Sequence, residues 1–301
     1  MISTLDPASQ FFLAGIEQIQ QNLQTAQAQL TTGLKINNVS DDPAALPDLW
    51  QTRSNLSQVQ QINSNLGLVS TEVNTAESVL ENAVTLVERA ETLGTQGASD
   101  TASASTRSDL SSELGSVLQQ LVASANTQVG GRYIFAGDSD RTSPYSYDPT
   151  QTYPVSGYQG STSTRTIQSP DGSTFSVALT AQQIFDSPDA TQNVFESINA
   201  LQQALANNDA SGINAALGNV STADTYLNQQ LAFYGTVQDH VSNATNYCQN
   251  YITQLQTQLS GIQDANETES ITDLTQAQTQ LQAALESRAQ IPRNSLFDFL
   301  A

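Results

Sequence analysis

Residues 220–262 read VSTADTYLNQQLAFYGTVQDHVSNATNYCQNYITQLQTQLSGI and decide the fold. Apolar side chains recur there in steps of three and four, which places them on one face of an α-helix. No proline interrupts the pattern, and at 1.5 Å per residue the helix would be roughly 65 Å long. A long helix with a narrow apolar stripe has to lay that stripe on other long helices. The stripe consists of Val220, Ala223, Leu227, Leu231, Tyr234, Val237, Val241, Ala244, Cys248, Tyr251, Leu255, Leu259 and Ile262.

The N-terminal half of the chain supplies helices with matching stripes. The spacing predicts a first helix within residues 2–34 and a second, longer helix from about Ala45 to Leu93. The stripe of the first helix is Phe12, Ile16, Ile19, Leu23, Ala26, Leu30 and Leu34. That of the second is Leu56, Val59, Ile62, Leu66, Val69, Val73, Ala76, Leu80, Ala83, Val87, Ala90 and Leu93. More than five heptads follow one another there, which is typical of coiled coils.

Turn-forming residues predict where these helices begin and end. Asp42–Pro43 reads as a helix N-cap followed by the first helical residue. Gly94–Ser105 is small and polar, so we expect a loop there. A third helix should follow from about Thr106, with Thr106 and Asp109 as a capping pair.

The composition changes at Gly130–Gly131, and the chain is then rich in Tyr, Ser, Thr, Gly and Pro. We expect a small β-rich insert, with Asp171–Gly172 as a hairpin turn. Its predicted strands are Tyr133–Ala136, Tyr153–Tyr158, Thr164–Gln168 and Thr174–Leu179. Helices resume after the insert, with a break expected at Asn207–Gly212 before the long stripe begins.

A last amphipathic helix is predicted from near Asp264. Its apolar positions are Ile271, Leu274, Ala277 or Gln278, Leu281 and Leu285. Beyond it the chain ends in an apolar segment containing Leu296, Phe297, Phe299 and Leu300, which we expect to bury against partners. We expect Leu281 to be exposed in the single chain and buried in an assembly.

The predicted fold is therefore mainly α. It is a long antiparallel, coiled-coil-like helical rod built from both chain ends, with a small β-rich insert in the middle. The predicted segments are 1–44 (N-terminal helix), 45–132 (first half of the rod), 133–183 (insert), 184–263 (second half of the rod) and 264–301 (C-terminal helix).

Composition argues against several classes of function. Nine basic residues against 29 acidic ones give a net charge of −20, which repels nucleic acid and anionic membrane surfaces. The single cysteine, Cys248, lies on the apolar stripe and reads as a small buried hydrophobe. With one cysteine and the single His240, we expect no metal site, no cofactor and no catalytic site. We also expect no secretory signal and no membrane span.

Several motifs resemble the bacterial flagellin and hook-associated protein family. They are LTTGLKINNVSDDPAAL at residues 30–46 and RAQIPRNSLFDFL at residues 288–300. GRYIFAG at residues 131–137 is similar to the hook–filament junction member of that family. Periodicity alone would equally fit methyl-accepting receptors, tethers and secreted translocator proteins.

This resemblance implies a structural subunit without enzymatic activity. Members of the family are exported unfolded by the flagellar type III apparatus, and a cytoplasmic chaperone binds their C-terminal segment. Their terminal helices form concentric tubes and their inserts face outward. A junction subunit would associate with itself in a ring between hook-associated protein 1 and flagellin, in the extracellular flagellum. The alternative is flagellin, the filament subunit itself.

The resemblance also implies an assembly interface on the two terminal helices and the apolar end. Its residues are Phe12, Ile16, Ile19, Leu23, Leu30, Ile271, Leu274, Leu281, Leu285, Leu296, Phe297, Phe299 and Leu300. In addition, Arg89, Leu93 and Glu113 match flagellin positions contacted by the animal Toll-like receptor that senses flagellin. The alternative for these three residues is packing between helices.

Overall fold

The computed structural model describes residues 7–168, 172 and 174–290, which form seven helices and two small antiparallel sheets. They divide between two compact units, one made of residues 1–58 and 251–301 and one of residues 59–250. The helices are α1 (Pro7–Thr32), α2 (Leu46–Ala98), α3 (Ala104–Ala125), α4 (Ala181–Phe185), α5 (Val194–Ala206), α6 (Ala210–Gln263) and α7 (Glu267–Gln290). The strands are β1 (Gln128–Val129), β2 (Arg132–Tyr133), β3 (Thr166–Gln168) and β4 (Thr174–Ser176). The predicted, mainly helical fold class is confirmed.

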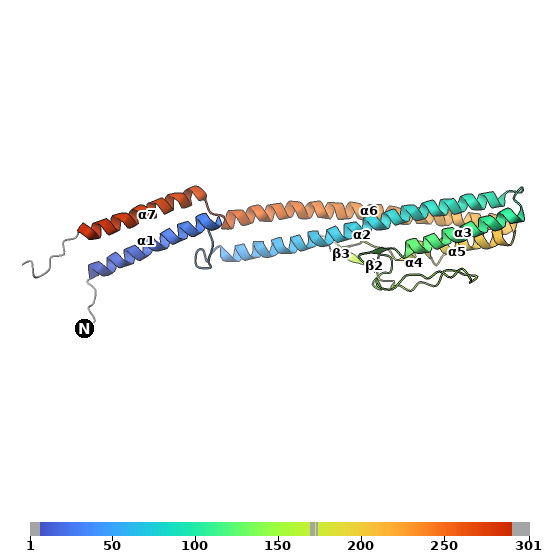
Figure 1. Cartoon of the computed structure of the whole chain (residues 1–301), viewed down its shortest axis with the longest axis horizontal. Coiled ribbons are helices and arrows are strands. Elements are labelled where there is room, and N and C mark those ends of the chain that lie inside the picture. Colours follow the sequence, from blue (N-terminus) through green and yellow to red (C-terminus); the bar gives the residue numbers. More distant parts are fainter. Residues whose placement is uncertain (1–6, 169–171, 173, 291–301) are drawn as a thin grey trace, which may run out of the picture. The chain divides into compact units, whose positions relative to one another are not determined.

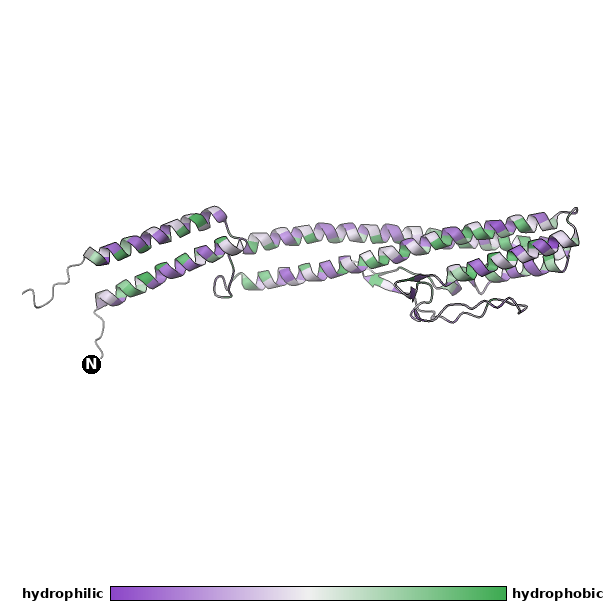
Figure 2. Cartoon of the chain, in the orientation of Figure 1, coloured by the Kyte–Doolittle hydropathy of each residue, from purple (hydrophilic) through white to green (hydrophobic). Residues whose placement is uncertain are grey.

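Within residues 59–250, α2 and α6 run side by side in opposite directions (Figure 1). Gln238 Nε2 donates a hydrogen bond to Asn74 Oδ1 at 2.8 Å, and Gly94 lies against Leu217. Figure 2 shows apolar residues recurring between polar ones along both helices. The stripe predicted on residues 220–262 is buried at Val220, Ala223, Leu227, Tyr234, Val237, Val241, Ala244, Cys248 and Leu255.

The predicted loop at Gly94–Ser105 is wrong over its first half, because α2 continues through Gly97. Both glycines are points of close approach between helices. A Cβ atom on Gly94 would lie 2.6 Å from Leu217 Cδ2, and one on Gly97 would overlap Leu205. Glycine lets α2 approach α5 and α6 closely, and it costs about 1 kcal/mol of helix propensity at each position.

Two other predicted helix boundaries are displaced by a few residues. Ser103 is the N-cap of α3, and its hydroxyl accepts a hydrogen bond from Thr106 N at 3.1 Å, so the predicted cap at Thr106 is wrong. The break before α6 is also shorter than predicted. Asp209 Oδ1 accepts from Ser211 N and Gly212 N, so that α6 already begins at Ala210.

A buried arginine joins the two turns at this end of the helices. Arg107 Nε donates to the carbonyl of Gly97 at 2.8 Å, and Nη2 donates to that of Ser99 at 3.2 Å. Nη1 donates to Asn208 Oδ1 at 2.6 Å, and Asn208 adopts a left-handed backbone with φ of 54°. The cation also lies at the C-terminus of α2, where the helix dipole favours positive charge. Arg107 thus holds the α2–α3 turn against the α5–α6 turn.

We predict that Arg107→Ala lowers the free energy of unfolding by about 3 kcal/mol, because it leaves the buried carbonyl group of Gly97 without its charged donor and removes the bond to Asn208. Arg107→Lys should recover only part of this loss, since one ammonium group cannot reproduce the planar fork. Denaturant unfolding followed by circular dichroism measures both. The exposed Arg141→Ala is the control and should change stability by less than about 0.5 kcal/mol. Equal effects of the two alanine variants would contradict this role.

Three carboxylates come together between α2 and α6. Burial raises the pKa of Asp224, and the charges of Glu88 and Glu91 raise it further, whereas a hydrogen bond from Asn228 lowers it. Asp224 Oδ1 is buried without a hydrogen-bond partner, while Oδ2 accepts from Asn228 Nδ2 at 3.1 Å. The charged form of Asp224 is therefore disfavoured in the folded protein.

We predict that Asp224→Asn stabilises the protein at pH 7. The folded-state pKa of Asp224 lies above its unfolded value, so wild type loses stability as pH rises through the folded pKa. Below the unfolded pKa, near 4, both proteins carry a neutral group and their difference should vanish. Thermal melts of both proteins between pH 3.5 and 7 test this. A difference that stays constant across that range would refute it.

The insert between α3 and α5 contains less strand than predicted. Gly130 and Gly131, both with positive φ, form the turn between β1 and β2. Of the predicted strand Tyr133–Ala136, only Tyr133 lies in a strand. Thr164–Gln168 and Thr174–Leu179 shorten to β3 and β4, and Tyr153–Tyr158 keeps a single bridge, between Val155 and Tyr147. In the predicted hairpin turn, Gly172 has φ of 87°, whereas Asp171 lies outside the described residues.

The insert shares its core with the helices, which explains the missing strands. The ring of Phe135 meets those of Phe185 and Tyr234 edge to face, with centroids 6.3 and 6.4 Å apart. The ring of Tyr145 meets that of Phe195 at 5.1 Å. Because these side chains turn toward the helices, the backbone around them does not continue as a regular ladder.

Candidate assembly interface

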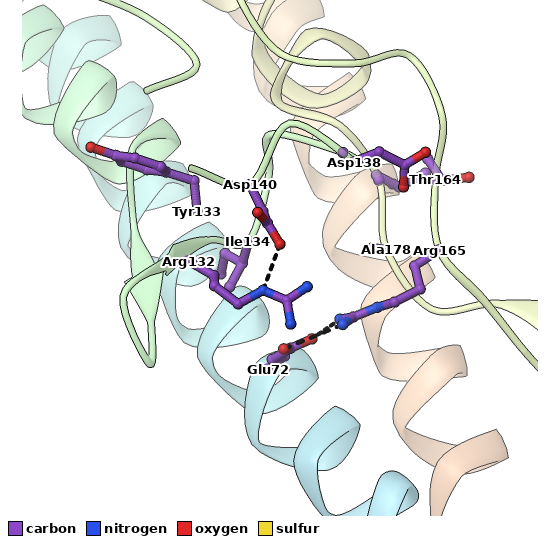
Figure 3. Close-up of a pocket in the computed structure, with 11 residues that line it drawn as sticks. Glu72, Arg132, Tyr133, Ile134, Asp138, Asp140, Thr164, Arg165 and Ala178 are labelled. Carbon is purple, nitrogen blue, oxygen red and sulfur yellow. Dashed lines mark hydrogen bonds and ion pairs between the residues drawn. The ribbon is translucent and has the colours of Figure 1, made fainter. Parts of the chain in front are cut away.

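A cavity of about 140 Å³ lies where the insert meets α2 (Figure 3). Arg165 of the insert pairs with Glu72 of α2 at this cavity, and Arg132 Nε lies 2.6 Å from Asp140 Oδ2. Each guanidinium is thus matched by a carboxylate, and Asp138 adds a further negative charge to the lining. The Arg165–Glu72 pair attaches the insert to α2, whereas the Arg132–Asp140 pair lies within the insert. The lining has no surplus positive charge for an anionic ligand.

Among the described residues, no group of three or more His, Cys, Asp or Glu side chains is placed to hold a metal ion. In the same residues, no helix combines the length and apolarity that a membrane span requires. Cys248 is buried, as predicted, and burial raises the pKa of its thiol. His240 is exposed, and its ring lies 5.4 Å from that of Phe175 on β4.

The predicted interface residues are found on α1 and α7, which pack against each other in the unit that holds both chain ends. The contact residues of α1 that are buried or half-buried are Phe12, Ile16, Ile19, Leu23, Ala26 and Leu30. Those of α7 are Ser270, Leu274, Ala277, Leu281 and Ala284. We call these two sets the seam. Leu281 is half-buried within the single chain, so the expectation that it is exposed there is wrong.

Polar contacts at both ends of the seam make the pair antiparallel. Ser270, which is 2% exposed, donates a hydrogen bond from Oγ to Gln29 Oε1 at 3.1 Å. At the other end, Arg288 Nη2 donates to Ser9 Oγ at 2.9 Å. The Arg288 guanidinium also lies over the ring of Phe12, 5.3 Å from its centroid, which is a cation–π distance. These contacts fix the register of α7 along α1.

The two chain ends are joined by backbone hydrogen bonds just beyond the seam. Lys35 N donates to the carbonyl of Gln263 at 2.6 Å, and Ala265 N donates to that of Gly33 at 2.9 Å. Gly33 has φ of 71°, which lets the chain leave α1 sharply. Arg53 Nη2 donates to Gln263 Oε1 at 2.6 Å, so the first turns of α2 also contact the end of α6 at Gln263.

A small apolar cluster lies near these backbone hydrogen bonds. Ile36, Leu46 and Leu49 are buried, and Leu259 and Ile262 of α6 pack against them.

The acidic pair before α2 forms a turn. Asp41 Oδ2 accepts from Asn37 N and Asn38 N, at 2.9 and 2.7 Å. Ala45 N donates to Asp42 O and Oδ1, each at 3.2 Å. Pro43 therefore lies in this turn, so its predicted place as the first helical residue is wrong. Helix α2 begins at Leu46, one residue after the predicted start at about Ala45.

Other predicted interface residues lie outside the seam. The side chains of Ile271 and Leu285 are 54% and 55% exposed, because the packing of α1 on α7 does not cover them. Ala277 is buried at 3%, whereas its neighbour Gln278 is exposed, which resolves the alternative left open by the sequence. Leu296, Phe297, Phe299 and Leu300 lie outside the described residues. Sequence reasoning missed Ser270 and Arg288, which continue the seam's spacing with polar side chains.

The three receptor-like residues lie at different depths. Arg89 Nη2 lies 2.5 Å from Glu113 Oε1, and both side chains are about half exposed. Leu93 is only 1% exposed and packs in the helical core. The structure thus brings Arg89 and Glu113 together at the surface, whereas the side chain of Leu93 is not accessible to a binding partner in this fold.

Comparison with known proteins matches both ends of the chain. Residues 2–140 match the bacterial flagellin N-terminal helical region, and residues 217–300 match the bacterial flagellin C-terminal helical region. The chain belongs to the bacterial flagellin family. Within it, the flagellar hook-associated protein 3 of Escherichia coli K12 is 27% identical over 318 aligned positions, covering 95% of each chain. That of Salmonella typhimurium is 28% identical, covering 75% of this chain and 78% of the relative.

The fold is also found among solved structures. A putative flagellar hook-associated protein from Vibrio parahaemolyticus superposes with a TM-score of 0.66 at 19% sequence identity. The superposition covers 74% of this chain and all of that structure. At this level of identity the likeness concerns the fold.

We predict that Leu281→Asp in this flagellin-family chain separates α7 from α1 without unfolding residues 59–250. A fully buried leucine contributes about 1.5–3 kcal/mol, and a carboxylate at this half-buried place adds a desolvation cost. Limited proteolysis should then cut α7 faster, while the cooperative melt of the helical core stays unchanged. The neighbouring Gln282→Asp, at an exposed position, is the matched control. Equal protection of α7 in both variants would count against the seam.

Proposed function

We propose that the protein is a structural subunit of the bacterial flagellum that joins the hook to the flagellin filament. The observation that carries this is the alignment with hook-associated protein 3 of Escherichia coli, which extends over 95% of both chains. It therefore crosses residues 141–216, the region between the two flagellin matches. On this proposal the protein is not an enzyme, and its work is done by packing surfaces.

The partners follow from this position in the flagellum. The subunit associates with itself in a ring, with hook-associated protein 1 on one side and flagellin on the other. Export by the flagellar type III apparatus and a cytoplasmic chaperone on residues 264–301 belong to the same proposal. It is supported by the exposed apolar side chains of Ile271 and Leu285 on α7, which are available to a partner.

Flagellin, the filament subunit, is the second candidate. The flagellin matches at both ends of the chain are compatible with it, because filament and junction subunits share these regions. The two functions differ in how association ends. A filament subunit adds copies of itself along an open helical lattice, whereas a junction subunit stops after one closed layer.

Gene deletion and polymerisation of the purified protein separate the candidates. A strain lacking this gene should keep its hooks and release flagellin into the medium, because the filament has no base to grow on. The purified protein should stay monomeric at high concentration, even in ammonium sulfate, which strengthens apolar burial. Electron microscopy of the cells and sedimentation of the protein are the measurements. Long filaments grown from the purified protein alone would assign it as flagellin.

The same strain tests the role of the terminal helices. A chain lacking residues 1–40 and 264–301 should retain helical residues 59–250 by circular dichroism but fail to restore filaments. The matched control is full-length protein produced at the same level. Restoration of filaments by the truncated chain would remove α1 and α7 from the proposed assembly surface.

A further inference from the structure

Glu72 of α2 and His240 of α6 lie at one level and on one face of the helix pair. The hydrogen bond between Asn74 and Gln238 sets the level, because two steps back along α2 match two steps forward along antiparallel α6. Glu72 and His240 each directly precede a buried stripe residue, whereas Asn74 and Gln238 each directly follow one. One residue is a turn of about 100° around the helix axis, and in antiparallel helices equal turns lead to the same face of the pair.

The hairpin of β3 and β4 contacts both helices at this level. Arg165, directly before β3, forms an ion pair with Glu72 (Figure 3). The ring of Phe175 on β4 lies 5.4 Å from that of His240, and the two planes are tilted by 33°. Val177 N donates to the carbonyl of Arg165 at 3.1 Å, and Phe175 is two residues from Val177, so both side chains lie on one face of the hairpin. We call Arg165 and Phe175 the clasp.

The helical rod is thin at the level of the clasp. Beyond it, α3 and α5 accompany α2 and α6, and Gly94 of α2 packs there against Leu201 of α5 and Leu217 of α6 (Figure 1). Around Glu72, the described part of residues 59–250 places only the insert beside the two long helices (Figure 1). The stability of the pair therefore depends there on α2, α6 and the clasp.

Two helical glycines lie close to the clasp without a packing reason in this chain. Gly67 precedes Glu72 by five residues, and Gly235 precedes His240 by five. A Cβ atom on either glycine would meet no heavy atom within 4 Å, in contrast to the crowded Gly94. Each of the two directly follows a buried stripe residue, so both lie on the face opposite the clasp. Glycine weakens a helix interior relative to alanine, and sharp bends in helices occur at such residues.

We infer that the clasp closes a compliant level of the α2–α6 pair, at which the two glycines let the helices bend or open. An ion pair at the surface and a single ring contact are each weak, so the clasp can release while the insert stays attached. The insert remains anchored to α6, because Leu179 N donates to the hydroxyl of Tyr234 at 3.1 Å and Phe135 packs on the same ring. The insert then acts as a regulator of rod stiffness, a role that goes beyond the proposed function and does not depend on it.

Hydrogen exchange of the purified full-length chain, read by mass spectrometry, tests the role of the glycines. The amides of residues 64–74 and 232–242 should exchange faster than those of α2 beside α3 and α5. Gly67→Ala combined with Gly235→Ala should slow exchange in both segments about fivefold, which corresponds to about 1 kcal/mol of helix propensity. Gly218→Ala is the matched control, because its Cβ would also lie in open space on α6. It should leave both segments unchanged.

Removal of the clasp should have the opposite effect. Arg165→Ala combined with Phe175→Ala should speed exchange in the same two segments about three- to tenfold and leave α3 and α5 unchanged. Arg165→Lys combined with Phe175→Tyr keeps a charge and a ring, and it should exchange nearly as slowly as wild type. Arg141→Ala, which removes an exposed arginine of the insert, should have no effect.

Three results would overturn the inference. The clasp has no such role if its removal leaves exchange in both segments at the wild-type rate. Equal acceleration in α3 and α5 would show that the variants destabilise residues 59–250 as a whole. Unchanged exchange in the double alanine variant at Gly67 and Gly235 would show that the glycines do not create a compliant level. Each of these results leaves the proposed function standing, since the deletion strain tests that separately.

Discussion

A narrow apolar stripe on a very long helix is the constraint on which this structure depends. The stripe of α6 is too narrow to form a core by itself, and only a helix of comparable length can cover it. The chain provides α2, of 53 residues against 54, from the other side of the insert. The insert starts and ends beside the helices, and its aromatic side chains pack on them: Phe135 on Tyr234 of α6, and Tyr145 on Phe195 of α5. Arg107 then fixes the turns where α3 and α5 join.

The sequence predicted the helices well, because helical periodicity is a local property that needs no knowledge of the partner. It predicted strands poorly, because Phe135 and Tyr145 turn toward helices distant in the chain. Gly94 and Gly97 were misjudged for a related reason. A glycine that starts a turn and one that admits a neighbouring leucine look the same in a sequence, and only the contact with Leu205 or Leu217 separates them.

The candidate interface could be predicted as a set of residues but not as a set of faces. Ala277 and Gln278 both fit the spacing of α7, since a shift of one residue moves from one stripe to the adjacent one. Polar side chains decide which stripe meets α1: Ser270 and Arg288 reach partners on α1 and set the rotation of the helix. A search for apolar periodicity cannot detect polar residues such as Ser270 and Arg288. Ile271 and Leu285 were therefore grouped with the seam, although they lie beside it.

The backbone hydrogen bonds that join Gly33 and Lys35 to Ala265 and Gln263 also imply an order of events in time. A ribosome adding about 5–20 residues per second completes α1 long before it makes α7, so the partner of the first helix arrives tens of seconds later. Residues 59–250 contain a core of their own and are complete before α7 is made, whereas α1 has no cover for its apolar stripe until then. Helix α1 is thus made early but can be covered only after α7 exists.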